Sequence, residues 1–356
     1  MKRSTSLLFI ALAFAASGCR SIPNYPETSV GALASMPADC HVATTADGRK
    51  LCSTRPDLKV ALFGDQSLGD AAHRVLELVK SEGADVAIDV GDFDYADDPR
   101  GWDQMLDAKL GADFPLLGVV GNHDVYEWPT YAELLQDRFQ RTSTQRAHCT
   151  GDQLVRSTCS FDGLYVVGSG IGTLGDNEAH LRHIDEALRD RPAVWKICAW
   201  HKNQHDMQAG NKEDAIGWKA YQLCQQAGAI VVTGHEHVYS RTRALGAVGD
   251  HDAAHGATGA DDDIALQPGR TMAIVSGLGG KETREVGSDQ AQAPWWASIV
   301  TNDFLKVNGE QRTPAQPIHG ALFITFHVDG DPLRARGYFK TIGGEVLDRF
   351  ELRYTP

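Results

Sequence analysis

The stretch ADVAIDVGDFDY, residues 84–95, joins an apolar run to an ending of two carboxylates and a phenol. The apolar run predicts a buried strand, and Asp92, Asp94 and Tyr95 follow directly at its carboxyl end. A strand does not need such an ending for its own stability. Carboxylate and phenol oxygens are hard ligands of the kind that metal ions bind. The stretch therefore raises the hypothesis of a metal site at the end of a strand.

Strands and helices alternate on both sides of this stretch. The expected strands cover residues 58–65, 84–92, 114–124, 192–202 and 229–237, and the expected helices cover 68–83, 99–111, 128–139, 177–190 and 213–228. This alternation predicts βαβ units and a largely parallel sheet. Residues 154–170 predict a hairpin, residues 243–269 a long surface loop, and the apolar segments from 271 to 353 the strands of a second sheet.

Length and charge limit the classes of function. A chain of 356 residues allows one large α/β domain or two ordinary ones. The formal net charge of -13 argues against a protein that binds nucleic acid through a broad basic face. An anionic substrate remains possible because bound cations can reverse the local field.

The first residues have the features of a targeting segment. Lys2 and Arg3 precede a short apolar core, which is too short to span a bilayer, and ASGC follows at residues 16–19. Small residues before Cys19 resemble a bacterial lipobox. That reading makes Cys19 a lipid anchor and predicts a membrane-anchored lipoprotein facing the periplasm or exterior. The alternative is a plain signal cut near Gly18 and a periplasmic or secreted protein.

We expect residues 1–18 to form a signal peptide, residues 19–56 a tether and N-terminal extension, and residues 57–356 the main domain. Six cysteines remain after Cys19, an even number that suits an oxidising compartment. Proximity in sequence suggests the pairs Cys40–Cys52, Cys149–Cys159 and Cys198–Cys224, although six cysteines allow other connectivities and Cys198 could be a free core residue.

Polar residues follow five of the expected strands. In chain order they are Asp65, then Asp92 and Tyr95, then Asn122 with His123, then His201, and finally His235 and His237. Ligands of open parallel sheets bind outside the carboxyl ends of the strands. We therefore expect these side chains to converge at one edge.

The motifs GDQ (64–66), GDFDY (91–95), GNHD (121–124), AWH (199–201) and GHEH (234–237) resemble those of calcineurin-like metallophosphoesterases over about residues 58–240. The purple acid phosphatase branch is the nearest pattern. Many family members place a metal-binding histidine in a DxH first motif, whereas Ser67 stands at that position here. The purple branch instead uses GDxxY, and GDFDY fits it. Ser67, Cys198 and Asp124 depart from the usual residues of that branch.

The resemblance implies a four-layer α/β/β/α sandwich of two mixed sheets with helices outside and a metal site at the carboxyl ends of the strands. It also implies two metal ions, Fe(III) with Zn, Fe(II) or Mn(II). The first ion would be bound by Asp65, Asp92, Tyr95 and His237. The second would be bound by Asn122, His201, His235 and the bridging Asp92.

The implied activity is the hydrolysis of a small phosphomonoester by a metal-bound hydroxide, as in an acid phosphatase. His123 would act on the leaving group, and His205 is a candidate second donor. Lys202 could add positive charge near the phosphate, although a lysine that is only solvated is the simpler interpretation. A phosphodiesterase or nucleotidase with the same metal centre is the alternative. A surface binding module without catalysis is a third hypothesis.

Overall fold

The computed structural model describes residues 41–44, 50–53, 55–142, 147–152, 155–189, 191 and 193–355. The chain divides into residues 1–32 and 33–356, and every described residue belongs to the second unit. The expected signal peptide, the Cys19 anchor and most of the tether lie outside the described residues. Two short strands of the N-terminal extension, β1 (His41–Thr44) and β2 (Lys50–Ser53), pair with each other.

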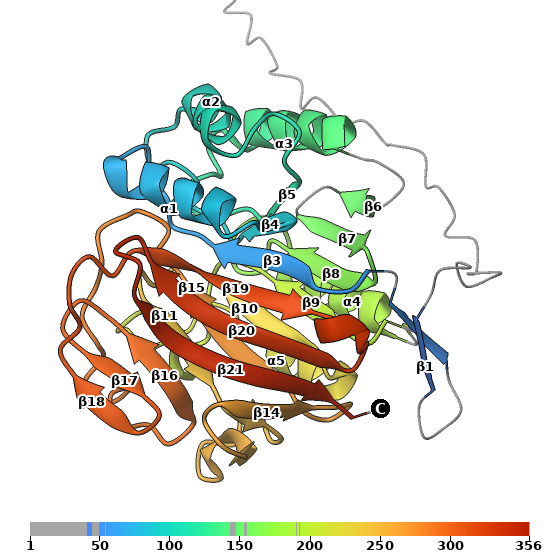
Figure 1. Cartoon of the computed structure of the whole chain (residues 1–356), viewed down its shortest axis with the longest axis vertical. Coiled ribbons are helices and arrows are strands. Elements are labelled where there is room, and N and C mark those ends of the chain that lie inside the picture. The colour runs from blue at the N-terminus through green and yellow to red at the C-terminus, as the bar shows by residue number, and fades with distance from the viewer. Residues whose placement is uncertain are drawn as a thin grey trace, which may run out of the picture. The chain divides into compact units, whose positions relative to one another are not determined.

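One sheet has seven strands in the order β14-β21-β20-β19-β3-β4-β5 (Figure 1). Its strands are β3 (Leu58–Phe63), β4 (Val86–Asp89), β5 (Leu116–Gly118), β14 (Asp263–Leu266), β19 (Gly320–Phe326), β20 (Arg334–Thr341) and β21 (Val346–Tyr354). The strands β3, β4 and β5 are parallel, whereas β19 pairs with β3 in the antiparallel direction. The sheet is therefore mixed.

The second sheet has ten strands in the order β18-β17-β16-β11-β15-β10-β9-β8-β7-β6. They are β6 (Ala147–Asp152), β7 (Arg156–Phe161), β8 (Leu164–Ser169), β9 (Lys196–Ala199), β10 (Ile230–Thr233), β11 (Tyr239–Thr242), β15 (Met272–Ser276), β16 (Trp296–Val300), β17 (Leu305–Val307) and β18 (Glu310–Arg312). The strands β8, β9, β10 and β15 are parallel, and their neighbours are antiparallel.

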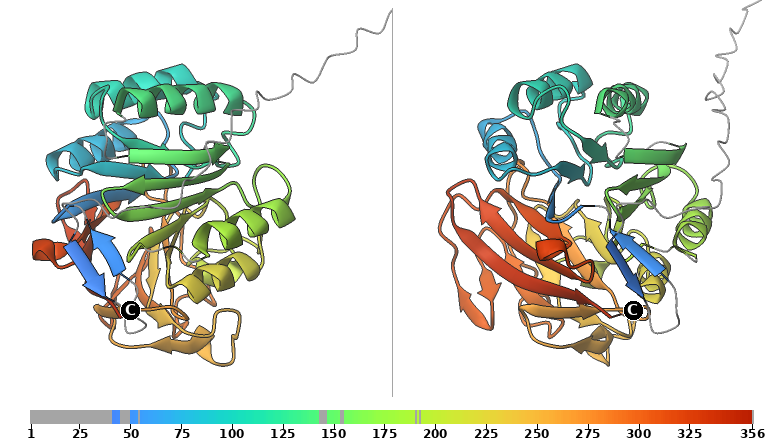
Figure 2. Two further views of the ribbon diagram at one scale, coloured as in Figure 1. Left: turned by 90° about the vertical axis from the view of Figure 1, so that its right-hand side faces the viewer. Right: turned by 45° about the vertical axis from the view of Figure 1, so that its right-hand side comes forward.

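Helices cover the outer face of each sheet, as the two views in Figure 2 show. Three of them, α1 (Asp70–Ser81), α2 (Pro99–Lys109) and α3 (Trp128–Thr142), lie over the seven-stranded sheet, where α1 contacts β19 and α3 contacts β5. Two others, α4 (Asn177–Leu188) and α5 (Lys219–Ala227), contact β8 and β10 of the other sheet. The four-layer α/β/β/α sandwich expected from the motifs is confirmed.

Alternation along β3 explains why the sheets and helices form these layers. Val60 and Leu62 pack in the core between the two sheets, whereas Ala61 and Phe63 pack against the α1–α3 layer. Both sets are fully buried. A strand with apolar residues on both faces has to lie between two other layers, because successive side chains point to opposite sides of the sheet.

The structure corrects three expectations. The strands after residue 271 do not form one second sheet, because β15 joins β10 whereas β19, β20 and β21 join β3. The expected helix 213–228 begins only at Lys219, after Gly217 with a positive φ of 66°. Residues 243–269 are not simply a loop: they include β14 and the short pair β12 (Ala244–Leu245) and β13 (Ala257–Thr258).

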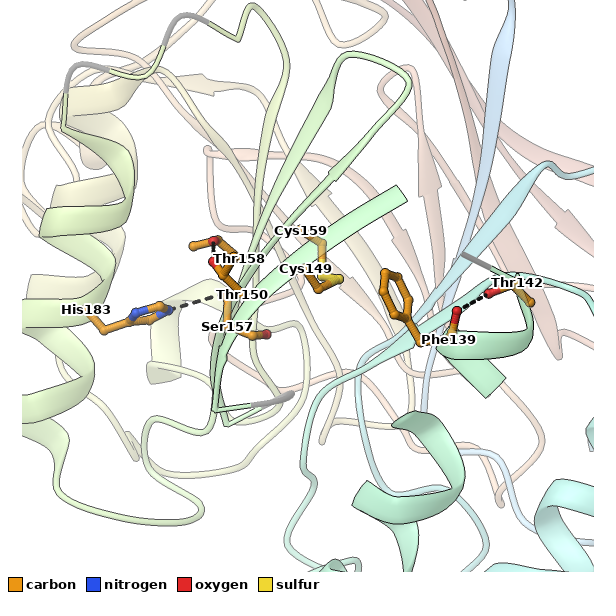
Figure 3. Close-up of a disulfide and its surroundings, with 8 residues drawn as sticks. All are labelled: Phe139, Thr142, Cys149, Thr150, Ser157, Thr158, Cys159 and His183. Carbon is orange, nitrogen blue, oxygen red and sulfur yellow. Dashed lines mark hydrogen bonds between the residues drawn. A yellow bond between two sulfur atoms is a disulfide. The ribbon is translucent and has the colours of Figure 1, made fainter. Parts of the chain in front are cut away.

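Two of the three expected disulfides are present. Cys149 and Cys159 are directly opposite on β6 and β7, and their bond is drawn in Figure 3. Cys198 on β9 bonds to Cys224 on α5, which ties this helix to the strand that leads to His201. The third expected pair includes Cys40, which lies outside the described residues. Structural disulfides are typical of exported proteins.

No helix in the described part of the chain is both long enough and apolar enough to cross a bilayer.

Removal of the Cys198–Cys224 bond should weaken the fold measurably. We expect the double variant Cys198→Ala/Cys224→Ala to lose about 3 kcal/mol of unfolding free energy, because the bond closes a loop of 26 residues in the unfolded chain. Urea denaturation of the two proteins measures this difference. Alkylation of the denatured, unreduced wild type should find no free thiol at either cysteine, and a free thiol there would refute the pairing.

Candidate metal centre

The polar residues that follow the strands come from both sheets. Asp65 and Asp92 follow β3 and β4 of the seven-stranded sheet, whereas His201 and His235 follow β9 and β10 of the other. The His201 Nδ1 atom donates a hydrogen bond across the two sheets to the carbonyl of Val90 at 2.8 Å. The expectation of a single sheet edge was therefore too simple: the site lies where the ends of two packed sheets meet.

Unusual backbone conformations place these side chains. Asp65, Asp92, Tyr95 and His235 all have positive φ, between 55° and 69°, which is costly for residues with a side chain. Four such residues in one place indicate that the surrounding structure fixes them for a purpose other than stability. Four of the expected metal ligands are thus held at some energetic cost.

Close approach of the turns explains the glycine in each motif. A Cβ atom on Gly121 would lie 2.1 Å from the Asp92 backbone nitrogen, and one on Gly91 would lie 2.7 Å from the nitrogen of Gly121. No side chain fits at either position. The GD and GN motifs therefore reflect the contact between two turns as well as the ligands themselves.

Asp65, Tyr95 and His237 form one cluster. The Tyr95 hydroxyl donates to Asp65 Oδ1 at 2.9 Å and lies 2.9 Å from His237 Nε2. His237 Nε2 is also 3.5 Å from Asp65 Oδ1. The three side chains assigned to the first metal therefore point at one another, and the tyrosine brings its oxygen to the centre of the group.

Asp92, His201 and His235 form a second cluster, and one ligand atom of each lies within 4.8 Å of the others. His201 Nε2 is 3.1 Å from Asp92 Oδ2. One buried atom here, Asn122 Oδ1, makes no hydrogen bond. Buried polar atoms normally have partners. A cation would satisfy this oxygen and the buried Asp92 carboxylate, so the donor set fits a metal ion.

The backbone orients two of the imidazole rings. His201 Nδ1 donates to Val90 O, and His237 Nδ1 donates to Glu282 O at 2.7 Å. Each contact fixes a proton on Nδ1 and leaves Nε2 facing the carboxylates. Metal-binding histidines generally have their second nitrogen fixed in this way.

Burial and neighbouring charges shift the pKa values of the carboxylates and of His201 in the site. Burial and the nearby Asp92 raise the pKa of Asp65 to about 7. Burial would also raise the pKa of Asp92, but His201 holds that pKa below its usual range. Burial alone would lower the pKa of His201, and Asp92 instead raises it to about 9. In the absence of a metal ion, His201 therefore supplies the positive charge that Asp92 needs.

The departures from the family pattern have structural explanations. The Asp124 carboxylate is fully buried and accepts hydrogen bonds from the backbone N–H groups of Asp92, Phe93 and Gly121, at 2.7–2.9 Å. It thereby joins the GNHD turn to the GDFDY turn. The Ser67 hydroxyl contacts the carbonyl of Gly280 and the N–H of Gly69, so it takes no part in either ligand cluster.

Asp94, the other acid of GDFDY, points away from both clusters. Its carboxylate accepts from the N–H groups of Ala96 and Asp98 and from the hydroxyl of Tyr131, at 2.7, 3.1 and 2.5 Å. The side chains of Asp92 and Asp94 therefore point in opposite directions from the turn. Asp94 stabilises the loop that carries Tyr95.

The two candidate catalytic histidines have different surroundings. His123 is exposed, its ring lies 4.5 Å from that of Tyr95, and its N–H donates to Asp92 Oδ1. His205, in the short helix η1 (His205–Met207), uses both ring nitrogens: Nδ1 contacts Lys212 O at 2.8 Å and Nε2 contacts Asp289 at 2.9 Å. A role for His205 as a proton donor stays a prediction, because its contact with Asp289 would first have to open.

Sequence reasoning missed two lysines near the clusters. The Lys212 ammonium lies 3.0 Å and 3.2 Å from the two ring nitrogens of His235. The Lys281 ammonium lies over the ring of Tyr95, 4.6 Å from its centre. Both residues lie in loops outside the strand-end motifs, so no pattern in the sequence singles them out.

Residues 38–239, more than half of the chain, match the sequence model of the calcineurin-like phosphoesterase family. The chain belongs to that family. The buried donor set described above is of a kind that can bind a metal ion. No curated protein matches the sequence.

Two solved structures share the fold. A purple acid phosphatase from yellow lupin (Lupinus luteus) seeds is 14% identical, with a TM-score of 0.58, and the match covers 88% of this chain and 58% of the lupin chain. This chain thus spans a little over half the length of that protein. PhoD is 10% identical, with a TM-score of 0.50, and the match covers 82% of this chain and 68% of PhoD. At such identities the likeness shows the fold alone.

Replacement of Asp65 by a neutral residue should stabilise the metal-free protein at high pH. The pKa of Asp65 is about 7 in the folded state and 3.8 ordinarily, so folding is penalised increasingly as the pH rises from about 4 to 7. Asp65→Asn removes this penalty. We expect its unfolding free energy, relative to wild type, to rise by about 2 kcal/mol between pH 5 and pH 8.

Urea denaturation of chelator-treated proteins at both pH values checks this expectation. The exposed Asp113→Asn is the matched control and should show no such trend. A difference between Asp65→Asn and wild type that does not change with pH would contradict the electrostatic explanation.

Proposed function

We propose that this chain is a binuclear metallophosphatase of the purple acid phosphatase type that hydrolyses phosphomonoesters. The observation that carries the proposal is the pair of adjoining ligand clusters, in which the buried Asp92 and His201 side chains face each other and the buried ligand atom Asn122 Oδ1 has no hydrogen-bond partner. A site built only for stability would not leave that oxygen unpaired, because an unpaired buried polar atom costs about 1–3 kcal/mol.

The ligand assignment follows the two clusters. Asp65, Tyr95 and His237 would bind one metal ion. Asn122, His201 and His235 would bind the other, with Asp92 between the two ions. When bound, the two cations would supply Lewis acidity and positive charge to the phosphoryl group and to the attacking water. Asp92 is suited to the bridging position, because its electrostatic effect reaches both Asp65 and His201.

The donor sets favour two different metals. Carboxylates and a phenolate suit a hard trivalent ion such as Fe(III), whereas two imidazoles and an amide suit Zn, Fe(II) or Mn(II). Tyr95 would occupy the place of the histidine that the first motif lacks. The proximity of its hydroxyl to both Asp65 and His237 supports this assignment.

The remaining residues act on the substrate. His123 is exposed and is held by its N–H contact with Asp92 and its ring contact with Tyr95. It would donate a proton to the oxygen of the leaving group as the ester bond breaks. Fixed donors of this kind stabilise charge that develops in the transition state, and they need no reorganisation during the reaction.

A phosphodiesterase or nucleotidase with the same metal centre is the second candidate. It rests on the same ligands, and a panel of monoester and diester substrates separates the two. A binding module without catalysis is disfavoured, because every residue expected to bind metal is present. Such a protein would bind two metal ions and remain inert towards all phosphoesters.

We further propose that the protein is exported. The two disulfides support an oxidising compartment. Residues 1–18 would be the signal peptide, and Cys19 would carry a lipid that anchors the catalytic domain, residues 57–356, to the membrane through the tether.

Loss of one ligand from the second cluster should abolish activity. We expect Asn122→Ala and His235→Ala each to lower kcat/KM for a phosphomonoester by at least about 1,000-fold and to reduce the number of metal ions bound per chain. Steady-state kinetics and elemental analysis measure the two effects, and circular dichroism tests whether the fold is intact. The exposed His148→Ala on β6 is the control. Full activity in either ligand variant would refute the proposal.

A further inference from the structure

The Lys212 side chain has an unusual environment. Its ammonium contacts both ring nitrogens of His235, at 3.0 Å and 3.2 Å. Among the described residues, no carboxylate lies within ion-pair distance of the Lys212 ammonium.

Buried side chains fix the backbone of Lys212. Its N–H donates to Glu236 Oε2 at 3.2 Å, and its carbonyl accepts from His205 Nδ1 and from Gln208 Nε2. Glu236 and Gln208 are almost fully buried, and Arg284 holds the second oxygen of Glu236. A solvated surface lysine needs no such support, so these contacts aim the side chain at the metal centre.

The charges near Lys212 change when metal is bound. The carboxylates that attract its ammonium at longer range include Asp65, Glu236 and Asp92; Asp65 and Asp92 are assigned as metal ligands, and Glu236 is paired with Arg284. Two bound cations would neutralise those carboxylates and leave the ammonium facing positive charge. An anion between the cations and Lys212 would then compensate the positive charge of the cations and that of the ammonium. The phosphoryl group of the substrate is such an anion.

We propose that Lys212 binds a non-bridging oxygen of the substrate phosphate and makes the site selective for dianionic phosphomonoesters over monoanionic phosphodiesters. The inference rests on the proposed phosphoesterase function. A phosphomonoester carries close to two negative charges at neutral pH, because its second pKa is about 6. A diester carries one charge, and its second ester group occupies an oxygen that an ammonium would otherwise contact. Lys212 therefore favours the monoester through both charge and hydrogen bonding.

His205 and Glu236 become positioning residues in this account. The hydrogen bond from His205 to the Lys212 carbonyl would then explain the histidine four residues after His201. Proton donation to the substrate would not be its role. His205→Asn should raise KM for the monoester in the same direction as loss of Lys212, with little change in kcat. A lower kcat at unchanged KM would instead indicate a proton donor.

The direct test compares two chromogenic probes, p-nitrophenyl phosphate and bis(p-nitrophenyl) phosphate. For Lys212→Met we expect kcat/KM for the monoester to fall about 10- to 100-fold, mainly through KM, and that for the diester to fall less than about threefold. Lys212→Arg should restore part of the monoester activity. Lys219→Met removes a charge from the exposed start of α5 and should leave both activities unchanged.

A binding measurement gives a second readout. In calorimetry on the metal-loaded protein, Lys212→Met should weaken binding of inorganic phosphate about 10-fold or more and leave binding of dimethyl phosphate nearly unchanged. Equal losses for the monoester and diester probes, or unchanged phosphate binding, would overturn the role of Lys212. If the wild type hydrolyses neither probe, the proposed function fails, and the phosphate comparison still decides whether Lys212 binds the anion.

Discussion

The constraint on which this structure depends is the burial of two neighbouring carboxylates, Asp65 and Asp92, without enough positive charge to compensate them. Each is at most 1% exposed. Desolvation of a charge costs several kcal/mol unless an opposite charge lies close by. In the metal-free protein, the raised pKa of Asp65 favours its neutral, protonated form. The charge of Asp92 is instead compensated by His201. Metal cations would resolve both problems, so the residues that destabilise the metal-free protein are those that would bind the ions.

The fold supplies the precision that such a site requires. The turns after β3, β4 and β10 adopt positive φ at their ligand residues, and glycines allow the turns after β4 and β5 to touch. Asp124 closes the arrangement, because its buried carboxylate binds three backbone N–H groups from the two turns. Because each cluster takes ligands from both sheets, the packing between the sheets sets the distances between the ligands. Rigid elements hold a functional site more accurately than loops alone.

Much of the site was predictable from sequence because its residues follow strands directly. The end of a strand fixes where the next side chain lies, so Asp65, Asp92 and Asn122 could be placed before the fold was known. The distribution of strands between the sheets was not predictable. The strands β15 and β19 are both wholly buried apolar runs, and such a run does not identify its partner strand.

Long-range loop contacts were also beyond sequence reasoning. Lys212 lies in an irregular segment before α5, and its position depends on Gln208 of the same segment and on Glu236 of the turn after β10. The role of Asp124 was missed for a related reason: its motif showed a departure from the family but not the backbone groups that the carboxylate binds. Local pattern predicts elements and their ends, whereas the contacts between loops follow from the complete fold.

The central claim is that Tyr95 occupies the place of the missing histidine as a ligand of the first metal ion. The visible absorption spectrum of the oxidised, iron-loaded protein tests it most directly, in the wild type, in Tyr95→Phe and in Tyr126→Phe, which removes an exposed tyrosine nearby in sequence. A charge-transfer band from tyrosinate to Fe(III) should be present in the wild type and in Tyr126→Phe and absent in Tyr95→Phe. A band that persists in Tyr95→Phe, or an iron-loaded wild type without one, would contradict the assignment.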